Sequence, residues 1–479
     1  MADLRLDRLD PAAVTLLRAV VAAAGRGVEP VLVGGTVRDA WLRRSGVTDL
    51  DVAVPSGALD LGRRIADRVG GAFVALDPER GAARVVVGGR RLDVTDYRAS
   101  TLAGDLARRD FTVNALAVPL RALLGRGRAP VIDPTGGLAD LRVRRLRLPA
   151  PGAIVDDPLR ALRGVRMEAL LGLRLTPAAA RAIAAAAPAV ARISAERVRD
   201  ELLGLLALPA SARALRRADR LGLLAVAVPE VEPMRSTRQP PPHRFSVLEH
   251  SLRAVAGADR VVARPHALVP FGEELAAHAR EPLAQGIERA HVLKLAALLH
   301  DVAKPETRRL VGGRVRFFEH DVRGAARVRA IGERLRLPGA VTDALERLVR
   351  HHLRPMHLAG AGALTDRARH RFYRDLGAET RDLLLLALVD AAAVSGDSPL
   401  VIWPRAALIR DLLRGWEVQR QAAANPPLVR GQDVMSRFGL APGPAVGQLL
   451  FRAREAQDLG LVRTREEALA YLESSPPDP

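Results

Sequence analysis

The sequence predicts a multidomain α+β protein, in which a mixed β-sheet with helices is followed by an all-helical remainder. Strand-like apolar runs alternate with helical stretches over the first ~140 residues, whereas amphipathic helical patterns alone follow from Leu159. A chain of 479 residues is also long enough for more than one buried core. We therefore expect four regions, at 1–145, 146–235, 240–415 and 416–479.

The elements follow in this order. Strands are expected at VLVGG, LDVAV, ARVVV and RLDVTDY, and a helix at ALDLGRRIADRV. The clearest later helices are AAARAIAAAAPAVARI and SAERVRDELLGLLAL, the second beginning with a capping sequence at Ser194. A proline-rich break spans 236–244, helices resume from Ser246 to about Gly415, and a last helical piece follows the NPP at 425–427.

The composition narrows the class of protein. A formal net charge of +19, almost entirely from arginine, favours a polyanionic partner such as nucleic acid. The absence of cysteine leaves histidine and carboxylates as the available metal ligands. No run of eighteen apolar residues and no apolar leader occurs, so we expect a cytoplasmic protein without a membrane partner.

A candidate phosphate-binding site follows the first expected strand. Gly34 and Gly35 lie between this strand and a predicted helix, where residues without a side chain let backbone amides approach an anion closely. Arg38, one turn into the helix, adds a positive charge that attracts a phosphate. We expect these three residues to bind a phosphate group.

Three aspartates form a candidate metal site next to these glycines. Asp49 and Asp51 are two residues apart in a strand, so both side chains leave the same face. Neighbouring carboxylates repel each other unless a cation lies between them, and Mg²⁺ prefers oxygen ligands. Asp93 is placed to supply the third carboxylate, with Asp96 as the alternative. The set meets the requirement of two-metal phosphoryl or nucleotidyl transfer.

The glycine-rich helix start and the DLD strand resemble the head of the class II tRNA nucleotidyltransferase and bacterial poly(A) polymerase family. The segment RRDFTVNAL at 108–116 is similar to the RRDFT-x-NA motif of that family. The resemblance implies that Arg109 and Asp110 hold the ribose and triphosphate of the incoming nucleotide, with Asn114 in the same motif. A salt bridge at a helix end is the alternative for Arg109 and Asp110.

A second family segment follows. DDPLRALRGVRMEALLGLRL resembles the EDxxR segment, with Asp156 in place of the usual Glu. The resemblance implies that Asp157 and Arg160 read the nucleobase. Residues spaced i and i+3 share a helix face, and a carboxylate acceptor beside a guanidinium donor complements the Watson–Crick edge of C or A. An ordinary ion pair within the helix is the alternative.

Histidines and aspartates recur in apolar helical segments between 246 and 390, namely SVLEHS, LAALLHDVAKP, FFEHDVRGA, RHHLRP and LLLALVDAAA. An unpaired His or Asp in a buried helix is unfavourable, and a shared metal ion removes that cost. Their order resembles the HD phosphohydrolase superfamily, with Mg²⁺, Mn²⁺ or Ni²⁺ as expected ions. The resemblance implies a first ion held by His250, His300, Asp301 and Asp390, and a second completed by His320 and His351.

The resemblance covers nearly the whole chain. It names the four regions as a nucleotidyltransferase head, a helical neck and RNA-binding domain, an HD domain and a helical tail. It implies an enzyme that adds CCA to the 3′ end of tRNA from CTP and ATP, with an HD domain that hydrolyses phosphoesters. One alternative is a poly(A) polymerase or an enzyme that adds only A or only CC. The other is an HD phosphohydrolase whose head only binds RNA.

Overall fold

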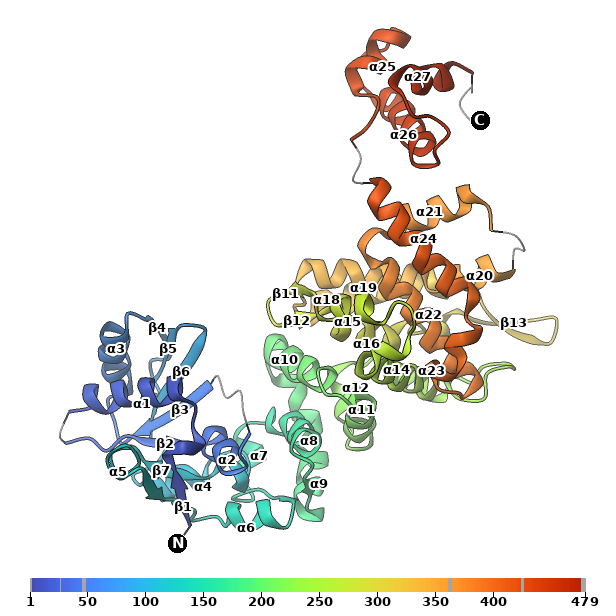
Figure 1. Ribbon diagram of the computed structural model, residues 1–479. Coiled ribbons are helices and arrows are strands. Elements are labelled where there is room, and N and C mark those ends of the chain that lie inside the picture. Colours follow the sequence, from blue (N-terminus) through green and yellow to red (C-terminus); the bar gives the residue numbers. More distant parts are fainter. Residues whose placement is uncertain (1, 26, 45–48, 361–363, 424–425, 475–479) are drawn as a thin grey trace. The chain divides into compact units, whose positions relative to one another are not determined.

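The computed structural model describes residues 2–25, 27–44, 49–360, 364–423 and 426–474 (Figure 1). The chain forms two compact units. Unit 1 comprises residues 1–201 and 217–227, and unit 2 comprises residues 202–216 and 228–479.

Unit 1 is built on a six-stranded mixed sheet with the strand order β4-β5-β6-β3-β2-β7. Within this sheet, β3 and β6 pair in parallel and the other neighbours are antiparallel. The strands are β2 (Val31–Val33), β3 (Asp49–Val54), β4 (Ala72–Asp77), β5 (Ala82–Val87), β6 (Arg90–Asp96) and β7 (Ala117–Pro119). The four predicted strands correspond to β2, β3, β5 and β6, so the mixed sheet of the predicted fold class is confirmed.

The central strand β3 explains why this sheet has a well-buried interior. Val52, Ala53 and Val54 are fully buried, whereas Asp49 and Asp51 at the start of the strand reach the surface of the sheet. Helix α3 (Ala58–Val69), which coincides with the predicted helix, packs on β5 and β6 and is itself covered by α1 (Pro11–Ala23). The apolar half of β3 thus anchors the strand and leaves its polar half at the edge of the core.

Short strands outside the six-stranded sheet, together with helices, make up the rest of unit 1. Two small pairs are β1 (Asp3–Arg5) with β8 (Arg128–Pro130), and β9 (Arg145–Leu146) with β10 (Arg174–Leu175). Helices α10 and α11 contribute residues to both units. The remaining helices are α2 (Gly35–Trp41), α4 (Leu102–Ala107), α5 (Leu120–Arg126), α6 (Gly137–Arg142), α7 (Ala153–Asp156), α8 (Arg160–Leu171), α9 (Pro177–Ala186), α10 (Ala195–Leu206), α11 (Ser211–Arg220) and α12 (Leu223–Ala227).

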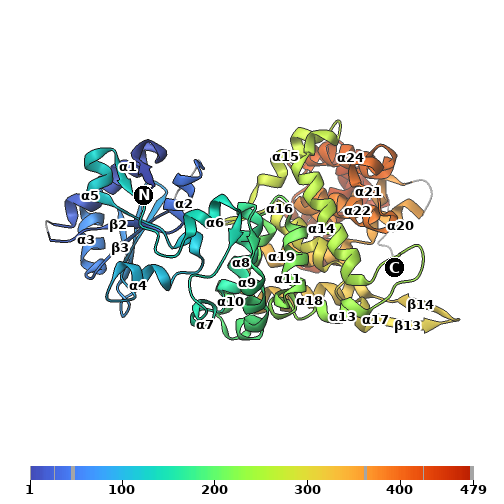
Figure 2. The same ribbon diagram turned by 90° about the horizontal axis from the view of Figure 1, so that it is seen from below.

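Unit 2 is mostly helical, as Figure 2 shows from a second direction. Its interior is formed by α14, α16, α18, α19 and α22, which pack on one another. The helices are α13 (Val231–Ser236), α14 (Val247–Ala263), α15 (Gly272–Arg280), α16 (Arg289–Leu299), α17 (Lys304–Thr307), α18 (His320–Arg334), α19 (Gly339–His351), α20 (Arg354–Gly360), α21 (Asp366–Leu376), α22 (Thr380–Ser395), α23 (Pro399–Ile402), α24 (Ala407–Ala423), α25 (Gly431–Phe438), α26 (Pro444–Asp458) and α27 (Arg465–Ser474).

Two expectations about the helical region are corrected. Strands do not stop at residue 159, because β10 and two hairpins follow: β11 (Pro282–Ala284) with β12 (Ile287–Glu288), and β13 (Arg308–Val311) with β14 (Arg314–Phe317). Strands of two to four residues are too short to show alternation in a sequence. Helix α24 also continues to Ala423, beyond the expected end near Gly415, while Asn425 of the NPP segment lies outside the described residues.

In the described part of the chain, no single helix has the length and apolar composition of a membrane span. One pair, Asp366–Ser395 with Pro399–Arg405, meets that criterion only in combination and is bent by 104°.

Candidate functional site

Two carboxylates meet where the parallel strands of unit 1 run side by side. Asp51 of β3 is the register partner of Asp93 of β6, and Asp49 is the partner of Arg91. The alternative residue, Asp96, pairs instead with Val54 and accepts a hydrogen bond from the Ala58 amide at the start of α3. The register therefore favours Asp93 over Asp96 as the third carboxylate.

Asp51 is the most perturbed carboxyl group of this site. Burial raises its pKa to about 6, and the neighbouring charges of Asp93 and Asp49 add to the rise, although Arg109 opposes it. A carboxylate held among other carboxylates in a poorly solvated place gains from a nearby cation. Oxygen-only donors suit Mg²⁺, so the donor chemistry of the three aspartates fits this ion.

Two arginines that the sequence did not indicate hold the outer carboxylates. Arg91 forms a two-point ion pair with Asp49 at 2.8 and 2.9 Å, and Arg84 of β5 forms one with Asp93 at 2.7 and 2.8 Å. Asp49, Asp51 and Asp93 accordingly do not belong to either compact group of three metal-ligand atoms found among the described residues. Binding of an ion by all three carboxylates requires these arginines to release oxygen atoms.

Gly34 supplies open space directly over Asp51. Its φ of +76° is a conformation that residues with a side chain rarely adopt. A Cβ atom at this position would lie 3.1 Å from Nη1 of Arg109 and 3.2 Å from Oδ2 of Asp51. The glycine therefore keeps a cradle open between a guanidinium and a carboxylate, which fits a phosphate together with a cation. At Gly35 a Cβ would lie 3.3 Å from Nη2 of Arg38.

Arg38 lines the same site and has protein partners that the sequence did not indicate. Its side chain is buried, Nε and Nη2 donate to Asp39, and Nη1 donates to Oδ1 of Asn114. Asn114 in turn donates through Nδ2 to Asp110, at 2.9 Å. Arg38 thus orients Asn114 and Asp110, and three of its five N–H donors are engaged by protein groups.

Arg109 keeps a more open position in the wall of the site. It contacts Asp105 of α4 at 3.3 Å, a partner that the sequence analysis did not identify. Asp110 lies 3.6 Å from Nη1 of Arg163, and the RRD segment is therefore part of a network rather than an isolated salt bridge.

Asp157 and Arg160 do not share a helix face, which corrects the prediction. Asp157 has extended backbone angles between α7 and α8, and Arg160 is the first residue of α8. Pro158 lies between them, and the residue before a proline is disfavoured in a helix. Asp157 is paired with Arg197 at 2.8 Å, and buried Arg160 donates to the carbonyls of Ala153 and Arg109.

The eleven residues predicted for this site, without the alternative Asp96, nevertheless line one cavity of about 610 Å³, which we call the carboxylate cavity. Nine of its lining residues are arginines and six are aspartates. This surplus of positive charge suits a triphosphate that arrives with a metal ion. Lining residues that the sequence analysis did not identify are Arg84, Arg91, Thr95, Arg98, Asp105, Arg163, Arg166, Met167, Leu170 and Arg197. Six of these ten residues are arginines, and a single arginine gives no distinct signal in a chain that is rich in arginine throughout.

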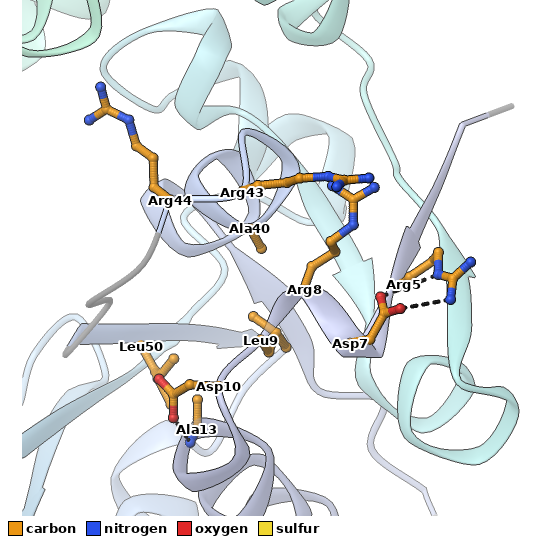
Figure 3. A pocket seen from close by; sticks show the side chains of 10 residues that line it. All are labelled: Arg5, Asp7, Arg8, Leu9, Asp10, Ala13, Ala40, Arg43, Arg44 and Leu50. Atoms are coloured by element: carbon orange, nitrogen blue, oxygen red, sulfur yellow. Dashed lines mark hydrogen bonds and ion pairs between the residues drawn. The ribbon is translucent and has the colours of Figure 1, made fainter.

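A second cavity of unit 1, about 580 Å³ in volume, lies on the other side of β3 (Figure 3). Leu50 lines it, while the adjacent Asp49 and Asp51 line the carboxylate cavity, as strand alternation requires. Figure 3 shows Arg5 paired with Asp7, and the side chain of Arg44 pointing away from those of Arg8 and Arg43. This cavity shares no lining residue with the carboxylate cavity.

Unit 2 contains a second candidate site, here called the histidine–aspartate cluster. Its members are His250, His300, Asp301, His320, His352 and Asp390. One compact group combines His250 of α14, His300 at the end of α16 and Asp390 of α22. Within it, Nε2 of His250 lies 2.9 Å from Asp390 and 3.3 Å from Nε2 of His300. These three residues were all predicted as ligands.

The second group differs from the prediction in one residue. It comprises Asp301, His320 and His352, whereas His351 is absent from it. Asp301 lies 3.5 Å from Nε2 of His320 and 3.7 Å from Nε2 of His352. Neighbouring residues of a helix point about 100° apart, so only one of two adjacent histidines faces a given cluster. Burial and the nearby Arg354 lower the pKa of His351.

Three histidines of the cluster are oriented by the same kind of local hydrogen bond. Nδ1 of His300, His320 and His352 lies 3.1, 2.9 and 2.7 Å from the carbonyl oxygen three residues earlier. A carbonyl only accepts, so Nδ1 carries the hydrogen and Nε2 is turned toward Asp301. In metal sites the same second contact fixes the orientation of a ligating histidine.

The buried atoms at the centre of the second group point to a cation. Among the described residues, Asp301 Oδ1, His320 Nε2 and His352 Nε2 have no hydrogen-bond partner. Burying such atoms without a partner is costly, and one divalent ion between them would satisfy all three. Nitrogen and oxygen donors suit Mn²⁺, Ni²⁺, Fe²⁺ or Mg²⁺. The donor set therefore fits a metal.

Positive charge is also favoured at the first group. Burial opposes protonation of His300, but the carboxylates of Asp301 and Asp390 outweigh it and raise its pKa to about 10. Lys304, one of the two lysines of the chain, donates to Asp301 at 2.7 Å and to Gln239 at 2.7 Å. The sequence analysis did not identify either contact, although Lys304 lies three residues after Asp301.

Comparisons with known proteins cover most of the chain. The Poly A polymerase head domain matches residues 31–147, the probable RNA and SrmB-binding site of polymerase A matches 172–235, and the HD domain matches 247–393. The chain is 37% identical to the A-adding tRNA nucleotidyltransferase of Deinococcus radiodurans over 449 residues, which is 92% of this chain and 94% of that protein. It is 37% identical to the CC-adding tRNA nucleotidyltransferase of Thermus thermophilus over 450 residues, which is 92% of each chain.

A similar structure is that of the Thermotoga maritima CCA-adding enzyme complexed with tRNA. The two folds match with a TM-score of 0.61 over 99% of each chain, at 20% sequence identity. This likeness shows a common fold.

Proposed function

The chain belongs to the tRNA nucleotidyltransferase family whose members carry a poly(A) polymerase head and an HD domain, and from this premise we propose that it adds nucleotides to the 3′ end of tRNA. The proposed substrates are tRNA with CTP, ATP or both, and the proposed place of action is the cytoplasm. The proposed domains are a head at 1–145, a neck at 146–235, an HD domain at 240–415 and a tail at 416–479.

The single observation that carries the proposal is that Asp51 and Asp93 are register partners on adjacent strands, next to the space that Gly34 leaves open. Mg²⁺ bound by Asp49, Asp51 and Asp93 would supply the charge that activates the 3′ hydroxyl of the tRNA and stabilises the leaving pyrophosphate. Arg109 is proposed to contact phosphate beside Gly34, and Arg38 and Asn114 hold Asp110 in place. Asp157 and Arg160 are proposed to contact the base, as the family motif implies.

The relatives favour a refinement of the expected complete CCA addition. The A-adding and CC-adding relatives each match over 92% of this chain. We therefore propose that this enzyme is specialised for one part of the CCA sequence, with addition of all three nucleotides as the alternative. Poly(A) synthesis is the less supported alternative.

One assay separates these activities. Purified protein is given tRNA that ends before CCA, after one C or after CC, together with each labelled nucleoside triphosphate. An A-adding enzyme extends only tRNA ending in CC, and only with ATP. A CC-adding enzyme extends the two shorter tRNAs with CTP and stops. Failure to extend any of the three tRNAs would contradict the proposal.

The HD domain is proposed to be a metal-dependent phosphohydrolase. The observation that favours this second function is the convergence of Asp301 Oδ1, His320 Nε2 and His352 Nε2 without protein partners among the described residues. An ion there would supply a charged centre for a phosphoryl group and for the water that attacks it. Asp301 belongs to one compact group and lies 3.2 Å from His300 of the other. Its negative charge would therefore act on cations at both groups.

Hydrolysis is tested with 2′,3′-cyclic and 2′-monophosphate nucleotides in the presence of Mg²⁺, Mn²⁺ or Ni²⁺. Asp301→Ala should abolish this activity and leave nucleotide addition largely intact, because the head carboxylates belong to unit 1. The melting temperature is measured alongside, since Asp301 is buried. Wild-type protein that neither hydrolyses these substrates nor binds metal in unit 2 would contradict the second function and leave the first untouched.

A further inference from the structure

A cavity of about 670 Å³ adjoins the histidine–aspartate cluster of unit 2. Two of its lining residues, His352 and Asp390, belong to the cluster, one to each compact group. The cavity therefore reaches one residue of each compact group. Its volume is within the usual range of small-molecule sites, about 300–1,000 Å³.

One wall of the cavity is a single face of α22. Most of this helix is buried, yet Ala387, Asp390, Ala391 and Val394 are accessible, at the spacing of one helical face. All four line the cavity. The two alanines leave room beside Asp390, so an apolar group can lie against the helix next to the cluster.

Lining residues from other helices are also apolar. Met356 of α20 lines the cavity with 61% of its surface exposed, and Leu408 and Ile409 at the start of α24 complete the wall. Methionine is flexible and polarisable, so it adapts to flat aromatic surfaces as well as to alkyl chains. An exposed apolar wall that ends at a cluster of charged ligands is suited to a molecule with one apolar end and one anionic end.

Two cations lie at this cavity. Arg244 and Arg405 are lining residues with exposed side chains. Within the described part of the chain, neither has a hydrogen bond or an ion pair through its guanidinium group. Free guanidinium groups near a metal-ligand cluster favour an anion such as a phosphoryl group.

We propose that this cavity binds the apolar ester group of a phosphoester whose phosphoryl group lies against His352 and Asp390. The proposal rests on the proposed phosphohydrolase function and narrows its substrates to phosphoesters with an aromatic or long alkyl group. Apolar contact with Ala387, Ala391 and Met356 selects the ester group, and Arg405 attracts the phosphoryl charge.

The reaction is a hydrolysis without an oxidant or reductant. The oxygen of water forms a bond to phosphorus, and the bond between phosphorus and the ester oxygen breaks. The proton released by the water ends on the leaving oxygen, so the products are an alcohol or phenol and a phosphate. The apolar alcohol then leaves through the cavity.

Binding is measured first, with a probe that cannot be hydrolysed. 1-Naphthylmethylphosphonate is titrated by its fluorescence into the full chain in EDTA and again with Mn²⁺. Ala391→Trp, which fills the cavity from an exposed position, should weaken binding by about tenfold or more in both conditions. Arg405→Ala should weaken binding of the phosphonate but not of 2-naphthalenemethanol, which carries no charge.

The matched control is Ala277→Trp, the same substitution at an exposed position of α15 away from the cavity. It should leave the affinity unchanged. The metal content and melting temperature of Ala391→Trp should equal those of the wild type, because the side chain of Ala391 is exposed. Absence of phosphonate binding by the wild type, or equal affinity of Ala391→Trp and Ala277→Trp, would overturn the proposal.

Hydrolysis assays distinguish the proposed selectivity for apolar esters from the phosphohydrolase activity on which it rests. The wild type should cleave 1-naphthyl phosphate more efficiently than glycerol 2-phosphate, and Ala391→Trp should remove that preference. Cleavage of both at equal efficiency would refute the apolar selectivity and support the phosphohydrolase activity. Cleavage of neither, combined with phosphonate binding that Ala391→Trp weakens, would refute the activity and support the cavity as a binding site.

Discussion

Asp51 and Asp93 face each other across the parallel pair β3 and β6 of the sheet in unit 1. Their carboxylates are thereby brought together from positions 42 residues apart, beneath the space left by Gly34. Asp93 is held from the other side by Arg84, so Asp51 is the member of the pair without a strong ion pair of its own among the described residues.

Asp51→Asn should reduce nucleotide addition by at least about 1,000-fold, because the neutral amide cannot hold a divalent ion. Affinity for tRNA should stay within about twofold, since backbone contacts by arginine do not need the metal. Single-turnover extension and a filter-binding titration measure the two effects. The control is Asp60→Asn, which changes an exposed carboxylate of α3. Substantial addition by the Asp49→Ala, Asp51→Ala double variant would refute the catalytic assignment.

Gly34→Ala should raise the KM for the nucleotide by about tenfold or more, because the new Cβ occupies the cradle between Arg109 and Asp51. Gly70→Ala is a close control: Gly70 also has a positive φ, +63°, but a Cβ there meets no atom within 4 Å. Both variants should lose a similar stability, about 1 kcal/mol, from backbone strain. Steady-state kinetics and thermal melts compare them, and equal kinetics of the two variants would contradict the proposed cradle.

Asp51→Asn should stabilise the metal-free protein at pH 7.5. The pKa of Asp51 is about 6 in the folded chain, above its ordinary value of 3.8, so ionisation above pH 6 favours the unfolded chain. The gain in the free energy of unfolding is at most about 3 kcal/mol at pH 7.5. It should shrink as the pH falls through 6 and vanish below 3.8. Denaturant titrations in EDTA at pH 7.5 and 5 measure it. A less stable variant at pH 7.5 would refute the raised pKa.

Asp157→Ala should change the choice of nucleotide more than the rate of addition, with GTP and UTP gaining relative to CTP and ATP. Arg160→Ala should act in the same direction, but it also removes bonds to two backbone carbonyls and therefore lowers stability. Competition among the four triphosphates gives the selectivity. Asp200→Ala, which removes an exposed carboxylate paired with Arg199, serves as the control. An equal fall in all four rates would give Asp157 a structural role only.

His352→Ala should weaken metal binding by unit 2 by about tenfold or more, whereas His351→Ala should leave it unchanged. The reason is position, since Nε2 of His352 lies 3.7 Å from Asp301 and His351 is outside both compact groups. Metal content after dialysis against Mn²⁺, with melting temperatures, compares these adjacent substitutions. Loss of metal in His351→Ala alone would restore the ligand set expected from the sequence.

The order of elements in unit 1 was largely predictable. The runs that became β2, β3, β5 and β6 combine apolar alternation with clear flanking turns, and α3 has a strongly one-sided apolar face. The hairpins β11–β12 and β13–β14 were missed because a strand of two to four residues has no periodicity to detect. The ion pairs of Asp49 with Arg91 and of Asp93 with Arg84 were missed because they follow from strand pairing, which local patterns do not contain.

The sequence by itself determined which chemistry is available: the aspartates two residues apart on a strand, the glycines at the start of α2, and the histidines and aspartates in apolar helices. These are properties of the local backbone, and alternation or helical spacing fixes them without any partner. Only the tertiary structure decided which groups meet. The register of β3 against β6 favoured Asp93 over Asp96, Pro158 separated Asp157 from the helix that begins at Arg160, and the packing of α19 on α16 and α18 turned His352 rather than His351 toward Asp301. Two adjacent residues have the same local sequence pattern, but their side chains point in different directions. Which of the two faces a site depends on the side on which a neighbouring element packs.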